Sequence, residues 1–109
     1  MATPQRYGPA FVASSAANIL NPSSGLVYRM KHIHLVNQGA AQRTVTLYIG
    51  ATGGSAAGTE LLKDHPIAVA GYTDLFMDTL LETADFLTGI ADAASDVVIT
   101  IDYEVEVTY

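Results

Sequence analysis

The chain has 109 residues, no cysteine, and eleven acidic against five basic residues, which gives a net charge of −6. This length predicts one domain, and a chain without cysteine has neither a disulfide framework nor a thiolate metal site. The acidic balance argues against nucleic acid and anionic membranes as partners, because both attract clustered Lys and Arg. No apolar run approaches the roughly 20 residues that span a bilayer.

The first 25 residues are rich in Ala, Ser, Pro, Gly and Asn, and the turn cluster "NPSSG" ends them. They predict an extended N-terminal arm with one possible short strand around Ala10–Ala13. Two prolines and a glycine keep the start of this segment out of any helix, and its single basic residue does not suit a signal peptide. We expect the arm to engage a partner, and residues 26–109 to fold without it.

Residues Leu26–Asn37 alternate like a strand, but the apolar face changes sides near Lys31–His32. Tyr28 and Met30 share one face, whereas Ile33 and Leu35 fall on the other. A β-bulge or a bend between two sheets explains this change. Burial of both faces, one in the core and one against another subunit, explains it equally.

The next segments also read as strands. Arg43–Ile49 alternates cleanly, and "PIAVA" predicts a short strand that starts at Pro66. Between them, Gly50–Gly58 is a glycine-rich connection that lacks the Gly-Lys-Ser/Thr ending of a phosphate loop.

The region from Tyr72 to Ile90 has two interpretations. "TLLETADFL" has helical spacing, but two short strands around Asp74–Leu80 and Asp85–Ile90, joined by a turn at Glu82–Ala84, fit the surroundings better. Val97–Tyr109 then gives the strongest alternation in the chain. Altogether the pattern predicts an all-β fold, a single β-sandwich or jelly-roll domain of about 6–8 strands with the N-terminal arm.

The pair His32-x-His34 places two imidazoles on one face of a strand, which is half of a transition-metal site. Cupin enzymes, which are jelly rolls, use such a pair followed closely by Glu, but Gln38 stands in that place here. We therefore expect His32 and His34 to be half-exposed or interface residues, and we assign no catalytic, cofactor-binding or metal-binding residue. A metal-dependent cupin-like enzyme using both histidines is the alternative from another functional class.

Carboxylates offer two further candidates. Asp102, Glu104 and Glu106 form an acidic stripe, which either is a solvated face, meets a basic partner, or gathers a cation. The carboxylates between Asp74 and Asp85 include possible acid–base pairs, but charged outer faces of strands explain them as well. No Gly-x-Ser-x-Gly motif accompanies the serines. We expect no enzyme and no cofactor.

The segments "YRMKHIHLVNQGAAQRTVTLYIGATGGSAAG" and "DFLTGIADAASDVVITIDYEVE" resemble small β-sandwich structural proteins of tailed bacteriophages. The likeness consists of strand and loop types over Tyr28–Val107. It implies a capsid decoration or cement protein that binds the major capsid protein or another virion protein, most often as a homotrimer. It also implies a virion location after assembly in the host cytoplasm. A tail, neck or baseplate component is the alternative.

Overall fold

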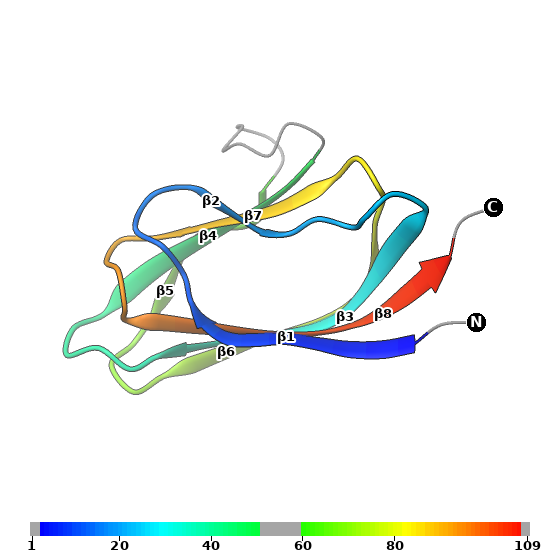
Figure 1. Ribbon diagram of the computed structural model, residues 1–109. Coiled ribbons are helices and arrows are strands. Elements are labelled where there is room, and N and C mark those ends of the chain that lie inside the picture. Colours follow the sequence, from blue (N-terminus) through cyan, green and yellow to red (C-terminus); the bar gives the residue numbers. More distant parts are fainter. Residues whose placement is uncertain (1–2, 51–59, 108–109) are drawn as a thin grey trace.

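The computed structural model describes residues 3–50 and 60–107 and builds them into two antiparallel four-stranded sheets (Figure 1). The strands are β1 (Thr3–Phe11), β2 (Ala17–Leu20), β3 (Leu26–Asn37), β4 (Arg43–Gly50), β5 (Glu60–Ile67), β6 (Tyr72–Leu81), β7 (Phe86–Ala91) and β8 (Val97–Val107). These two described ranges contain no helix long and apolar enough to cross a membrane. Apart from Gly50, the glycine-rich connection Gly50–Gly58 lies outside the described residues.

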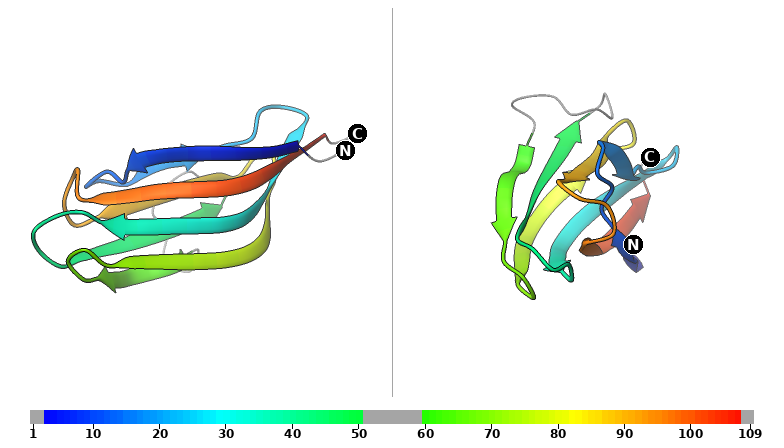
Figure 2. Two further views of the ribbon diagram at one scale, coloured as in Figure 1. Left: turned by 90° about the horizontal axis from the view of Figure 1, so that it is seen from below. Right: turned by 90° about the vertical axis from the view of Figure 1, so that its left-hand side faces the viewer.

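The strand order identifies the sandwich as a jelly roll. One sheet has the order β1-β8-β3-β6 and the other β2-β7-β4-β5. The outermost strands of the chain pair with each other, then the next two, and so on inward to β4 with β5. This is one long antiparallel ribbon rolled into two layers, and Figure 2 shows the first sheet face-on. The predicted all-β sandwich is therefore confirmed.

The core lies between the sheets and follows from the period-2 patterns. Ile99 and Ile101 of β8 are buried, as are Val45 and Leu47 of β4, as the alternation of both segments predicts. Side chains that alternate along antiparallel strands bury one face and leave the other to solvent. The inner face of β8 becomes half-exposed beyond Ile101, toward the end of the sandwich.

The change of face within β3 is a β-bulge. The register of β3 shifts between Met30 and His32 against both of its neighbours, β6 and β8. Against β8 the extra residue is Lys31, whereas against β6 the extra residue lies in β6, between Phe76 and Thr79. Met30 and Ile33, three positions apart, both point inward and are fully buried. A bulge alone thus explains the sequence pattern. It also turns the two histidines of β3 toward the outer face of the sheet.

The structure corrects the prediction of an N-terminal arm, because residues 3–20 supply a strand to each of the two sheets. β1 pairs with β8 along its length, and β2 pairs with β7. Val12, between them, is only 2% exposed. The arm interpretation failed because Pro and Gly suggest a linker, yet prolines are tolerated in edge strands. Gly8 has a φ of +83°, and a Cβ there would lie 2.5 Å from the Ile99 carbonyl oxygen, so β1 needs glycine at this point.

After the glycine-rich connection, the structure corrects the predicted strand at Pro66 and confirms the two strands predicted between Tyr72 and Ile90. The strand expected from Pro66 onward ends at Ile67, and Gly71 instead donates a 2.8 Å hydrogen bond to the Ala68 carbonyl in a tight turn. This turn carries the chain from one sheet to the other, so it cannot continue the strand. The two-strand interpretation of the following region is confirmed by β6 and β7, with a turn closed by a hydrogen bond from Asp85 N–H to Glu82.

Candidate functional site

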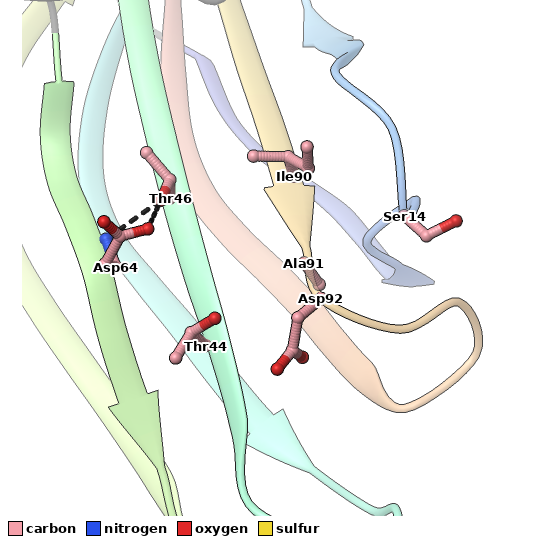
Figure 3. Close-up of a pocket in the computed structure, with 7 residues that line it drawn as sticks. All are labelled: Ser14, Thr44, Thr46, Asp64, Ile90, Ala91 and Asp92. Atoms are coloured by element: carbon pink, nitrogen blue, oxygen red, sulfur yellow. Dashed lines mark hydrogen bonds between the residues drawn. The ribbon is translucent and has the colours of Figure 1, made fainter.

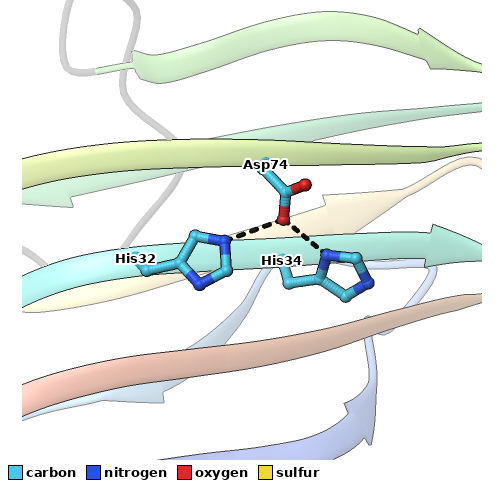
Figure 4. A group of neighbouring side chains, drawn as sticks. All are labelled: His32, His34 and Asp74. Carbon is cyan, nitrogen blue, oxygen red and sulfur yellow. Dashed lines mark hydrogen bonds and ion pairs between the residues drawn. The ribbon is translucent and has the colours of Figure 1, made fainter.

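The outer face of the β1-β8-β3-β6 sheet carries a cluster of two histidines and one aspartate. His32 and His34 lie two apart on β3, and Asp74 lies on the neighbouring strand β6 (Figure 4). Asp74 Oδ1 is 2.7 Å from His32 Nε2 and 2.6 Å from His34 Nδ1. Both imidazoles therefore point at the same carboxylate oxygen.

A second carboxylate and two aromatic rings hold these imidazoles in place. Asp102 of β8 faces His32 across the strand pair, and its Oδ2 lies 3.3 Å from His32 Nδ1. Phe76 stacks on the His32 ring with 4.5 Å between centroids and an angle of 9°, and Tyr72 lies 5.7 Å from the His34 ring. The His32 ring is thus fixed by a carboxylate at each nitrogen and an aromatic ring on its face.

These contacts favour the charged forms of His32 and Asp74. The hydrogen bond to Asp74 raises the pKa of His32 above its usual value, with a smaller contribution from Asp102 and against the opposing effect of desolvation. The hydrogen bonds from His34 and then His32 lower the pKa of Asp74. The negative charge of the Asp74 carboxylate therefore favours a proton or another cation at the His32 ring beside it.

The rest of this face is a network of ion pairs. Arg29 Nε lies 3.0 Å from Glu106 Oε2, and Lys31 Nζ lies 2.8 Å from Asp78 Oδ1. The contact with Glu106 raises the pKa of Arg29, and the hydrogen bond from Lys31 lowers the pKa of Asp78. The predicted acidic stripe therefore meets basic partners on β3 of its own sheet at Asp102 and Glu106.

The second sheet carries a small pocket of about 200 Å³ on its outer side (Figure 3). Thr46 and Asp64 line it and bond to each other, since Thr46 Oγ1 accepts from Asp64 N–H at 2.9 Å and lies 3.3 Å from Asp64 Oδ1. Ser14 and Asp92 stand on its other side. No histidine lines this pocket, so the serine there has no imidazole base beside it.

The sequence indicated His32 and His34 as a pair but placed Asp74 among the possible acid–base carboxylates. His32 and His34 come together as their spacing predicts, whereas Asp74 was considered only as one of several acid–base carboxylates. The other carboxylates of that group lie outside the cluster. Asp78 accepts a hydrogen bond from Lys31, and Asp85 accepts one from the backbone N–H of Glu82 in the turn before β7. The alternation of β6 could have located Asp74, but pairing it with β3 required the topology.

The comparisons with known proteins support the fold and no family. No protein-family model and no curated protein matches this sequence. A chain from the structure of Bacillus endospore appendages, described as a family of disulfide-linked pili, is similar with a TM-score of 0.50 and 16% identity. The likeness covers 100% of this chain and 87% of that chain. At this identity the match supports the all-β architecture alone.

Proposed function

We propose that this protein is a non-enzymatic structural subunit that assembles through β6 and the outer face beside it. The observation that carries this proposal is the exposure of two aromatic side chains on that strand: Phe76 is 80% exposed and Tyr72 is 68% exposed. Large exposed apolar side chains that lie close together mark interaction surfaces, and aromatic residues are enriched at the centres of interfaces.

The geometry of the outer face suits docking better than catalysis. The His32–His34–Asp74 cluster lies on an open sheet, whereas an active site excludes water from a concave pocket. The described pockets are lined by other residues, such as Thr46 and Asp64 on one sheet and Phe11 and Gln38 beside the other. This arrangement favours a binding face over the cupin-like alternative.

Within the structural class, we assign the protein to the decoration or cement subunits of a phage head. The resemblance of its strand and loop pattern to such proteins supports this role. A small jelly roll with exposed aromatic side chains on one edge strand, β6, also suits attachment to a lattice. Its partner would be the major capsid protein or another virion protein, its location the virion, and its own state a homotrimer. The alternative within the class is a tail, neck or baseplate component.

The likeness to a chain from pili supports a structural role, but this chain cannot use the disulfide chemistry described for those pili, because it has no cysteine. The assembly proposed here is non-covalent and depends on exposed apolar groups and free strand edges.

The test is the position of the protein in intact particles. We expect mass spectrometry of purified virions to detect the protein and a reconstruction to place β6 against a neighbouring subunit. Phe76→Ser should reduce its occupancy on the particle at least tenfold, whereas Phe11→Ser, on the opposite edge of the same sheet, should not. Absence from virions, or an unchanged occupancy of the Phe76 variant, would contradict the proposal, and density in the tail would favour the alternative.

A further inference from the structure

We propose that His32, His34 and Asp74 form a binding site for a divalent first-row transition-metal ion such as Zn²⁺, which links the edge strand β6 to β3. The three donor atoms, His32 Nε2, His34 Nδ1 and a carboxylate oxygen of Asp74, all lie within 4.8 Å of one another. The inference is independent of the assembly role proposed above, since it concerns a ligand and not a partner protein.

The donor set selects the class of metal. Imidazole nitrogens suit zinc, copper, nickel and iron, whereas calcium and magnesium prefer oxygen ligands throughout. Two histidines and one carboxylate also hold Fe²⁺ in some enzymes, but Zn²⁺ binds nitrogen and oxygen donors more tightly than Fe²⁺ does. Three protein ligands leave one tetrahedral position for water.

Binding the ion requires movement of all three side chains. Zinc bonds of about 2.0–2.2 Å place neighbouring ligand atoms about 3.3 Å apart in a tetrahedral site. Asp74 Oδ1 lies 2.7 Å from His32 Nε2 and 2.6 Å from His34 Nδ1. Binding would therefore move this oxygen away from both nitrogens, and rotation of the imidazoles would bring the two nitrogens, which lie within 4.8 Å of each other, to about 3.3 Å apart.

A second and independent observation points the same way. Asp102 Oδ2 lies 3.3 Å from His32 Nδ1, the ring nitrogen turned away from Asp74. A carboxylate on the far nitrogen fixes the tautomer of a metal-binding histidine and orients its other nitrogen toward the ion. The Phe76 ring stacked on His32 further limits the rotation of that imidazole. The cluster thus has both ligands and the outer contacts that orient them.

The experiment is a Zn²⁺ titration of the chelator-treated protein by calorimetry. We expect one Zn²⁺ per chain, with affinity lowered at least tenfold in His34→Gln and Asp74→Asn, and about tenfold in Asp102→Asn. His65→Gln is the matched control, because His65 bonds to Thr73 Oγ1 and stands outside the cluster. Its affinity should equal that of the unmodified protein.

Two further readouts separate binding from misfolding. At a Zn²⁺ concentration about 100 times the dissociation constant, the melting temperature should rise by about 10 °C, and His34→Gln should lose this rise while keeping its β circular dichroism spectrum. Co²⁺ should give the visible absorption of a tetrahedral site. If the unmodified protein binds Zn²⁺ no better than the His34 variant, or if His65→Gln removes the binding, the inference is wrong and the cluster is a hydrogen-bonded network only.

Discussion

The two edges of the β1-β8-β3-β6 sheet are built in opposite ways. β1 carries Pro4, Gly8 and Pro9 among its nine residues, and its register against β8 breaks where Gly8 and Pro9 lie. β6 runs for ten residues without proline, glycine or lysine. Edge strands expose unpaired backbone groups, and proline, bulges and charges prevent other chains from pairing with them. β1 has such protection, whereas the charged residues of β6 are two aspartates, Asp74 and Asp78.

This difference indicates which side of the molecule is available for assembly. In the second sheet, the edge strand β2 has only four residues, and β5 is interrupted by Asp64 at a φ of 45° and by Pro66. Among the edges that the structure describes, β6 is therefore the longest and has no proline. It also carries Phe76 and Asp74, and the other two residues of the proposed metal site lie on β3, so recognition is concentrated on one strand pair.

Deleting residues 2–13 should have the largest effect, because it removes β1 and Val12. Burial of a valine side chain alone is worth about 1.5–3 kcal/mol, and β8 would become an unprotected edge. We expect the free energy of unfolding, measured in urea, to fall by at least about 3 kcal/mol. An unchanged urea midpoint would mean that β1 is a dispensable arm after all, and the contrast between the two edges would fail.

Asn37→Ala should loosen β6 while leaving β1 in place. The Asn37 side chain is fully buried, donates to the carbonyls of Ala41 and Ile67, and accepts from Gly39 N–H, while its backbone N–H donates to the Gly71 carbonyl just before β6. Loss of the amide leaves buried groups unpaired, at a cost of about 2–3 kcal/mol.

Hydrogen exchange would show where the Asn37 variant opens. Amides at the start of β6 should lose protection before those of β1, because the turn that precedes β6 is held by Asn37. The exposed neighbour Gln38 is the control, and Gln38→Ala should change the free energy of unfolding by less than about 0.5 kcal/mol. Equal loss of protection at both edges would show that Asn37 supports the whole sheet.

Phe76→Lys should abolish self-association with little effect on stability. The side chain is 80% exposed, so its replacement should change the free energy of unfolding by less than about 0.5 kcal/mol. Sedimentation should then show the 11.5 kDa species in place of the proposed trimer. Phe11→Lys places the same change on the β1 edge and should leave the trimer intact. A trimer that dissociates only in the Phe11 variant would reverse the assignment of the edges.

Asp78→Asn should give the smallest effect, and one that depends on pH. Lys31 lowers the pKa of Asp78 in the folded protein, so this contact stabilises the fold above the unfolded pKa of about 3.9. The contribution is lost as the pH falls through the lower folded value. The urea midpoints of variant and parent should differ slightly at pH 7 in low salt and converge near pH 2. A gap that persists in acid would point to a contact other than the ion pair.

The sequence alone predicted the strands β3, β4, β6, β7 and β8 and the inner faces of β4 and β8. The alternation of β4 and β8 is local, and a period of two tells which side chains point together. It also indicated the change of face in β3, because Met30 and Ile33 cannot share a face in a regular strand, but it left a bulge, a bend and burial of both faces open. Local sequence signals gave the wrong prediction at β1, because proline and glycine occur both in linkers and in protected edge strands.

Only the tertiary structure decided what the histidines meet. Asp74 lies 40 residues after His34 and Asp102 lies 70 after His32, and strand order places both beside β3. Sequence spacing fixes distances along one strand, whereas contacts across a jelly roll depend on which strands become neighbours. Burial was decided in the same way, since Phe76 and Leu81 belong to one apolar strand, yet one is 80% exposed and the other fully buried. The sheet has a solvent side and a core side, and the side on which each residue falls depends on the packing of the second layer.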